Sequence, residues 1–220
     1  MGNKYLYIAT SWQGFIQQIV LLTGSGYRHY CFVNYPEHKQ DKFTKIDKKL
    51  IRRYETDMQK NQLWRNKKEG NANFKFLRYE NMAIILMATN NFQGRKTQTK
   101  EGVEIDDDFL SIDKKPLILE FGKETSLKVH SVNGKMTMSM SSLMYKNKKA
   151  ELLEVAAKKS VKLALYEFGK LNGIPTYSGN FNQRKELLDI LVDELKRHNV
   201  KVFKNHFYIK NQRTKFKVFD

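Results

Sequence analysis

Three segments in the first part of the chain have the apolar pattern of β-strands. Residues 4–10 alternate apolar and polar side chains, which predicts a short strand. Residues 27–35 are aromatic and β-branched and predict a second strand, which ends at Pro36 because proline lacks a backbone donor. Residues 74–89 contain two apolar runs around a Glu-Asn pair, and this arrangement predicts a β-hairpin.

Two segments between these strands have helical spacing instead. Residues 12–22 and 46–54 carry apolar side chains three or four positions apart, so each is expected to form a helix that buries one face. Asp47 falls in the first turn of the second helix, where the helix dipole favours a negative charge. Residues 58–70 are polar, basic and centred on Trp64, which predicts either another short helix or an exposed arm.

The second part of the chain starts with strands and continues with helices. Residues 117–142 hold three alternating runs, and the last two are joined by Asn-Gly, a preferred two-residue hairpin turn. Residues 149–171 predict one long helix, and residues 184–197 predict a second. The tail at residues 200–219 alternates again, which predicts a β-ribbon.

These elements predict an α+β fold in which antiparallel hairpins pack with helices, because strands and helices follow one another without a regular βαβ repeat. The chain is expected to divide into two subdomains. Residues 1–90 form a basic α+β half and residues 91–116 an acidic or polar loop or linker. Residues 117–220 form a half with β-hairpins, two helices and the basic C-terminal ribbon.

The charge of the chain points to an anionic partner. Its 220 residues include 40 Lys or Arg against 23 Asp or Glu, which leaves a formal net charge of +17. Self-repulsion of this size destabilises an isolated folded molecule, so a polyanion such as DNA or RNA is the expected partner. Hydrophobic residues make up 40% of the chain, which is enough for a folded core.

Cysteine content and hydropathy indicate where the protein acts. Cys31 is the single cysteine, which excludes an internal disulfide framework and a multi-cysteine zinc cluster and favours the reducing cytoplasm. The longest apolar stretch, residues 15–22, is shorter than the about 20 residues of a membrane span, and no export signal is recognisable. We therefore expect a cytoplasmic protein without a membrane partner.

Positive charge concentrates in two segments. Residues 39–68 contain eleven Lys or Arg against four acidic residues, and residues 196–219 contain eight Lys or Arg, no acidic residue and interleaved aromatic side chains. Cations neutralise phosphates and release counterions, and aromatic rings stack on bases. The alternative for each segment is a solvated charged surface. The expected nucleic-acid-binding residues are Lys45, Lys48, Lys49, Arg52, Arg53, Trp64, Arg65, Lys67, Lys68, Lys201, Lys204, Tyr208, Lys210, Arg213, Lys215 and Lys217.

Acidic residues offer a candidate site for chemistry. The candidate metal ligands are Asp106, Asp108, Asp113 and Glu120, and the candidate catalytic residues are Asp113, Glu120 and Lys123. Carboxylates at a strand edge can hold Mg²⁺ for phosphodiester hydrolysis, and a lysine can stabilise the developing charge. The pattern resembles that of PD-(D/E)xK nucleases, but Lys123 follows Glu120 by three positions, which places the two side chains on opposite faces of a strand. The alternative is a solvated acidic turn.

Four stretches carry a second resemblance: HYCFVNYPEHK, KIDKKLIRRYETD, LWRNKKEGNANFKFLRYENMAIILMAT and IPTYSGNFNQRKELLDIL. They resemble a family of uncharacterised bacterial proteins, in which an IPE-like turn precedes a D-x-KLI helix. In that family a W-x-R motif leads into AN-x-x-YLR and a hydrophobic strand that ends in AT. The resemblance spans residues 30–191 and implies a single unit, but it implies no activity and no catalytic residue.

The sequence leads to three hypotheses. The first is a protein that binds DNA or RNA through Lys and Arg and through aromatic stacking, without a cofactor, as an accessory factor of a replicon, a mobile element or a ribonucleoprotein. The second is a Mg²⁺-dependent nuclease or nicking enzyme, and the third is a basic scaffold for an acidic protein partner. No motif that reads particular bases is present, so recognition is expected to tolerate different sequences.

Overall fold

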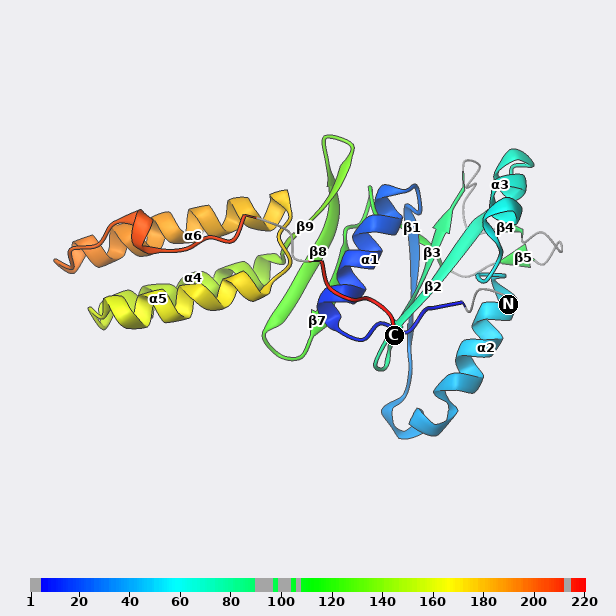
Figure 1. Cartoon of the computed structure of the whole chain (residues 1–220), viewed down its shortest axis with the longest axis horizontal. Helices are drawn as coiled ribbons and strands as arrows, with labels where there is room; N and C mark the ends of the chain where they lie inside the picture. The colour runs from blue at the N-terminus through cyan, green and yellow to red at the C-terminus, as the bar shows by residue number, and fades with distance from the viewer. Residues whose placement is uncertain (1–4, 90–96, 99–103, 106–107, 212–214) are drawn as a thin grey trace. The chain divides into compact units, whose positions relative to one another are not determined.

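The computed structural model describes residues 5–89, 97–98, 104–105, 108–211 and 215–220. The chain divides into two units, the first formed by Met1–Pro116 together with Phe216–Asp220 and the second by Leu117–Lys215. Each unit combines an antiparallel sheet with helices (Figure 1), which confirms the predicted α+β class. None of the helices in the described ranges is long and apolar enough to cross a membrane.

The first unit is built on a four-stranded antiparallel sheet in the order β2-β3-β1-β6. Its strands are β1 (His29–Asn34), β2 (Asn73–Tyr79), β3 (Met82–Ala88) and β6 (Leu110–Ser111). A separate short antiparallel pair consists of β4 (Thr97–Gln98) and β5 (Glu104–Ile105). Strands β2 and β3 form the predicted hairpin. Residues 5–10, predicted as a strand, make instead a single parallel bridge from Ile8 to Arg78 of β2.

Helices pack on both faces of this sheet. They are α1 (Trp12–Gly24), the 3-10 helix η1 (Glu37–Lys42), α2 (Phe43–Arg53) and α3 (Lys60–Lys68). On one face, the ring of Phe15 in α1 lies 6.1 Å from the ring of Tyr79. On the other face, Phe43 of α2 joins Phe74 and Ile85 in one cluster of buried apolar residues. Because both faces are covered, the centre of β3 is completely buried, and removal of this apolar surface from water stabilises the unit.

The second unit has a three-stranded antiparallel sheet in the order β7-β8-β9. Its elements are β7 (Leu117–Phe121), β8 (Thr125–Val132), β9 (Lys135–Met140), α4 (Ser142–Ala157), α5 (Val161–Lys170), η2 (Leu171–Gly173), α6 (Ser178–Arg197) and η3 (Lys204–His206). Asn133 and Gly134 have positive φ angles of 50° and 76°, which the two-residue turn between β8 and β9 requires. Helix α6 packs so closely on β9 that a Cβ at Gly179 would lie 2.7 Å from the carbonyl oxygen of Met138.

The single long helix predicted for residues 149–171 is wrong. The helical segment begins earlier, at Ser142, and is divided between α4 and α5. At the break, Lys159 has a φ of 54°, a left-handed conformation that a helix interior does not allow. Ser160 then caps α5, because its side chain accepts a hydrogen bond from the backbone N–H of Leu163 at 3.3 Å.

The β-ribbon predicted for the tail is also wrong. Within residues 200–211 and 215–220 the structure has no β-strand, and η3 is the regular element there. The last residues of the tail are bonded to the first unit, where Phe216 donates to the Gln17 side chain and Val218 accepts from the backbone N–H of Thr10. The earlier part is held within the second unit. The Asn172 amide donates to the carbonyl oxygen of Tyr208 and accepts from the backbone N–H of Lys210, each at 2.9 Å. This part of the tail is therefore bonded to a side chain of η2 and not to another strand.

Candidate nucleic-acid interface

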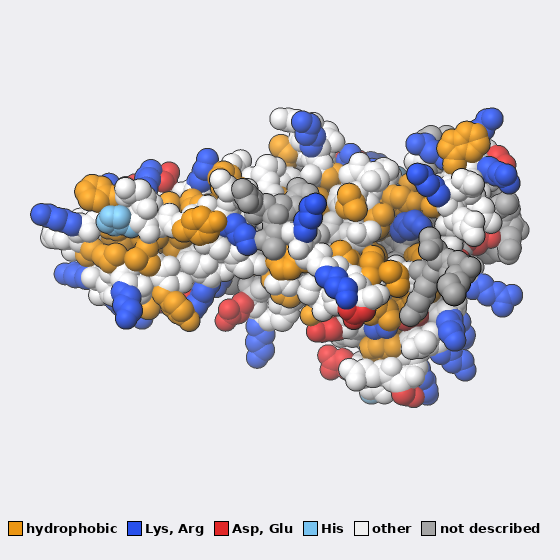
Figure 2. All heavy atoms as spheres, in the orientation of Figure 1, with side chains coloured by type: hydrophobic (Ala, Val, Ile, Leu, Met, Phe, Trp, Pro, Cys, Tyr) orange, Lys and Arg blue, Asp and Glu red, His pale blue; other side chains and the backbone are white. Residues whose placement is uncertain are grey.

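Helix α2 separates an apolar face from a cationic face. Lys45, Lys48, Lys49 and Arg52 follow the spacing i, i+3, i+4 and i+7, so they form one exposed row, here called the α2 stripe. None of these four side chains forms an ion pair with a carboxylate in the described part of the chain. Figure 2 shows Lys and Arg side chains gathered along α2 and around α3. Arg53 adjoins the stripe, with its guanidinium carbon 5.6 Å from the centre of the Tyr54 ring.

The opposite face of α2 is tied to the sheet by a buried charge. The expectation that Asp47 lies in the first turn of the helix is wrong, because α2 begins at Phe43 and Asp47 follows one turn later. The Asp47 side chain is fully buried. Asp47 accepts two hydrogen bonds from Nε of Arg78, both at 3.1 Å, and one from the Tyr35 hydroxyl at 2.8 Å. Burial, and then the hydrogen bond to Asp47, raise the pKa of Tyr35, so this hydroxyl stays protonated and acts as a donor.

Residues 58–70 form the short helix of the two predicted alternatives, and its outer surface is cationic and aromatic. Lys60, Trp64 and Lys68 are spaced four residues apart and therefore share one exposed face. Trp64 is 63% exposed, and Nζ of Lys68 lies 5.4 Å from the centre of its ring. Such an indole presents a flat face to solvent beside positive charge, which suits stacking on a nucleic-acid base. Arg65 is also exposed.

An open groove of about 740 Å³ lies between α2 and α3. It is lined by Lys48 and Arg52 of the α2 stripe, by Gln62 of α3 and by the acidic residues Glu55 and Asp57. Two carboxylates inside the groove repel phosphate. The floor of the groove is therefore less favourable for an anion than the outer α2 stripe.

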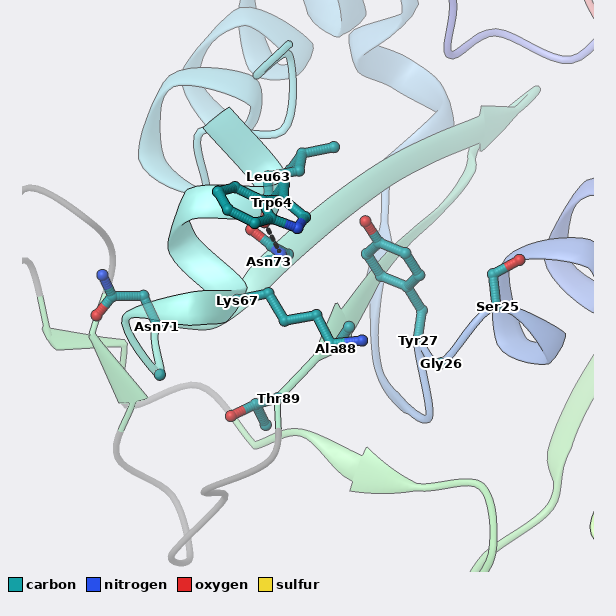
Figure 3. Close-up of a pocket in the computed structure, with 11 residues that line it drawn as sticks. Ser25, Gly26, Tyr27, Leu63, Trp64, Lys67, Asn71, Asn73, Ala88 and Thr89 are labelled. Atoms are coloured by element: carbon teal, nitrogen blue, oxygen red, sulfur yellow. Dashed lines mark hydrogen bonds between the residues drawn. The ribbon is translucent and has the colours of Figure 1, made fainter. Parts of the chain in front are cut away.

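A smaller cavity of about 250 Å³ lies between α3, the turn that precedes β1 and the end of β3. Its walls include Tyr27, Trp64, Lys67, Asn71, Asn73 and Thr89 (Figure 3). Among the described lining residues, Lys67 is the only charged one. The cavity therefore combines two aromatic rings, a cation and several neutral hydrogen-bonding groups.

The C-terminal candidates are divided between the two units. Lys204 makes an ion pair with Asp189 at 2.7 Å, and Lys217 makes one with Asp220 at 2.9 Å. Tyr208 is 70% exposed and Lys210 is partly buried. Lys201 and Lys215 are exposed, and Arg213 lies outside the described residues. Because Lys217 belongs to the first unit and the rest of the described set to the second, we do not treat these residues as one site.

The acidic candidates are likewise divided between the two units. Asp113 belongs to the first unit and pairs with Arg28 at 3.2 Å, whereas Glu120 is exposed on β7 of the second unit. Lys123 is exposed in the turn after β7, Asp108 is exposed in the first unit, and Asp106 lies outside the described residues. In the part of the chain that the structure describes, no group of three or more His, Cys, Asp or Glu is placed to hold a metal ion.

Sequence reasoning found Trp64 and Lys67 but missed the other side of the cavity. Tyr27 and Thr89 reach it because strands β1 and β3 pair with each other, and this pairing has no local signal. Asn71 reaches it because the chain turns back after α3 at Gly70, which has a φ of 82°. The Gly-Asn dipeptide was the one available sign of this turn.

Comparisons with protein-family models, with curated proteins and with solved structures find no match to this chain. This outcome is consistent with the resemblance to an uncharacterised family, and no characterised family supplies a function.

Proposed function

We propose that the first unit binds nucleic acid through the α2 stripe and the exposed surface of α3. The observation that carries the proposal is the α2 stripe itself. Four cations occupy one helical row, and none is neutralised by a carboxylate in the described ranges. An unpaired row of like charges is unfavourable by itself, and phosphates along a strand relieve the repulsion while counterions are released.

The buried contacts of α2 support this function. The ion pair between Asp47 and Arg78 fixes the apolar face of α2 on the sheet, which orients the α2 stripe outward before any ligand is present. A surface ordered in advance avoids part of the conformational entropy that binding otherwise costs. DNA and RNA both offer the required row of phosphates.

The C-terminal candidates have a minor part in this proposal. Lys204 and Lys217 are paired with carboxylates of the chain, so they have less free charge to offer than the α2 stripe. Accessory action in a replicon, a mobile element or a ribonucleoprotein, and a cytoplasmic location, remain predictions from the sequence.

A matched pair of charge variants tests the proposal. In one variant, Lys45, Lys48 and Lys49 are each changed to Gln, and in the control variant Lys149, Lys158 and Lys162 of the second unit are changed to Gln. Both variants lose the same net charge, and all six lysines are exposed. Binding of a fluorescent oligonucleotide by anisotropy is expected to weaken about tenfold or more in the first variant and less than about threefold in the control.

Equal losses in the two variants would contradict the proposal, because affinity would then follow total charge and not the α2 stripe. If the protein bound an acidic polypeptide and no oligonucleotide, the proposal of nucleic-acid binding would be overturned. That result would favour the scaffold hypothesis instead.

A further inference from the structure

The small cavity beside α3 has the chemistry of a nucleotide site. Tyr27 and Trp64 supply aromatic surfaces, and the side chain of Lys67 extends from α3 across the cavity toward Ala88 at the end of β3 (Figure 3). A base needs a flat apolar partner and a phosphate needs a cation, so these residues provide one group for each part of a nucleotide. No acidic residue is among the described residues that line the cavity, so none of these residues repels a phosphate.

Neutral polar groups in the walls can meet the edge of a base. The Asn73 side chain is more than nine-tenths buried, and its amide nitrogen donates to the carbonyl oxygen of Leu63 at 2.8 Å. Its Oδ1 atom has no hydrogen-bond partner among the described groups. A buried acceptor without a donor is unfavourable, and because Asn73 lines the cavity, an amino group of a base bound there would supply the donor.

The Tyr27 hydroxyl is suited to the same role. Burial raises the pKa of Tyr27 to about 12, so the hydroxyl is protonated at neutral pH and can donate a hydrogen bond. In Figure 3 this hydroxyl points toward the side of the cavity formed by α3. A neutral donor on one side and the Lys67 ammonium group on the other are compatible with an anionic nucleotide.

We infer that the cavity binds one unpaired nucleotide of a single-stranded nucleic acid, with the base against Trp64 and Tyr27 and its phosphate near Lys67. The inference rests on the proposed function and makes it more specific. A base within a duplex is paired on its edge and stacked on both faces, so it has no free surface to offer this cavity. The flanking phosphates of the strand then lie along the exposed cations of the α3 surface.

Oligonucleotides with and without bases distinguish a nucleotide site in the cavity from general binding of phosphates by the proposed interface. We would measure binding of a single-stranded oligonucleotide of about 12 nucleotides, an abasic strand with the same number of phosphates, and a duplex. The intact single strand is expected to bind about tenfold or more tightly than the abasic strand. Trp64→Ala is expected to remove most of this difference, and because Trp64 lies on the surface, the change leaves the core intact.

Fluorescence gives a second, independent measurement. The chain has two tryptophans, so in a Trp12→Phe background the emission reports on Trp64 alone. Quenching is expected with the intact strand and not with the abasic strand, because stacking requires a base. Lys67→Gln is expected to weaken binding of the intact strand while leaving the quenching at saturation unchanged.

The results of these binding and fluorescence measurements distinguish failure of the nucleotide site from failure of the proposed function. Equal affinity for intact and abasic strands, or tighter binding of the duplex, would overturn the nucleotide site and leave the proposed function standing. A free nucleoside monophosphate could also quench Trp64 fluorescence at the same low concentration as the single-stranded oligonucleotide. This result would overturn the claim that the cavity binds a nucleotide within a strand. Binding of none of the three oligonucleotides would overturn the proposed function itself.

Discussion

Asp47 of α2 and Arg78 of β2 form a buried ion pair, with Nε of Arg78 3.1 Å from both carboxylate oxygens of Asp47. The Arg78 guanidinium also lies 5.5 Å from the centre of the Phe43 ring and donates to the carbonyl oxygen of Glu80 at 2.9 Å. These contacts connect the helix that carries the α2 stripe to the central hairpin of the first unit. This buried pair therefore helps to set the orientation of the proposed interface, together with the apolar contacts of Phe43.

Replacing Asp47 with Asn is expected to destabilise the first unit by about 3 to 5 kcal/mol, because the Arg78 charge would remain buried without its partner. Both tryptophans of the chain, Trp12 and Trp64, belong to this unit, so tryptophan fluorescence during denaturant unfolding reports on it. The control is Asp41→Asn, which removes the same charge from an exposed position in η1. A loss of the same size in both variants would show that net charge, and not the buried pair, sets the stability.

Lys159 ends α4 in a conformation that glycine adopts more easily. Lys159 has a φ of 54°, at which the Cβ of every residue except glycine lies too close to the backbone. Lys159→Gly is therefore expected to stabilise the second unit by about 0.5 to 1 kcal/mol. The adjacent Lys158 has a helical φ of −74°, and Lys158→Gly is expected to destabilise the unit by a similar amount. Unfolding followed by far-ultraviolet circular dichroism measures both changes. The same sign for the two variants would contradict this explanation of the helix break.

His130 is expected to make the stability of the second unit depend on pH. Burial, with a smaller contribution from Lys128, lowers the pKa of His130 below its ordinary value of 6.5, and Nε2 lies 3.1 Å from the Ser139 hydroxyl. The unfolded chain therefore binds the proton more readily. Stability is complete above the ordinary pKa and is lost as pH falls through the lowered pKa of the folded state.

His130→Gln is expected to flatten this dependence of the unfolding free energy between about pH 7.5 and pH 5. The control variant His206→Gln changes an exposed histidine of the same unit and is expected to leave the dependence unchanged. Denaturant midpoints measured across this range by circular dichroism compare the two variants. An unchanged pH dependence in His130→Gln would contradict the assignment to His130.

Local pattern predicted much of the fold, because amphipathic helices and alternating strands are encoded within a few neighbouring residues. The hairpin of β2 and β3, the Asn-Gly turn and the apolar face of α2 followed directly from spacing. The break at Lys159 did not, since lysine carries no sign of a left-handed conformation. The tail was misread because its backbone bonds to a side chain, that of Asn172, and not to another strand, which a period of two does not reveal.

The candidate site was predictable only where it lies on one helix. The α2 stripe and Trp64 were visible because positions three and four apart share a face. The burial of Asp47 was not visible, because its partner Arg78 is 31 residues away along the chain. The cavity depends in the same way on residues from separate elements, such as Tyr27 and Thr89, which only the folded sheet brings close to α3.

The salt dependence of binding tests the central claim most directly. The logarithm of the association constant is plotted against the logarithm of salt concentration for the wild-type protein and for the variant with Lys45, Lys48 and Lys49 changed to Gln. Each phosphate contact with a single strand contributes about −0.7 to this slope, so the wild-type slope is expected to be steep and the variant slope shallower by about two. A flat slope for the wild-type protein, or identical slopes for the two proteins, would contradict binding of a polyanion by the α2 stripe.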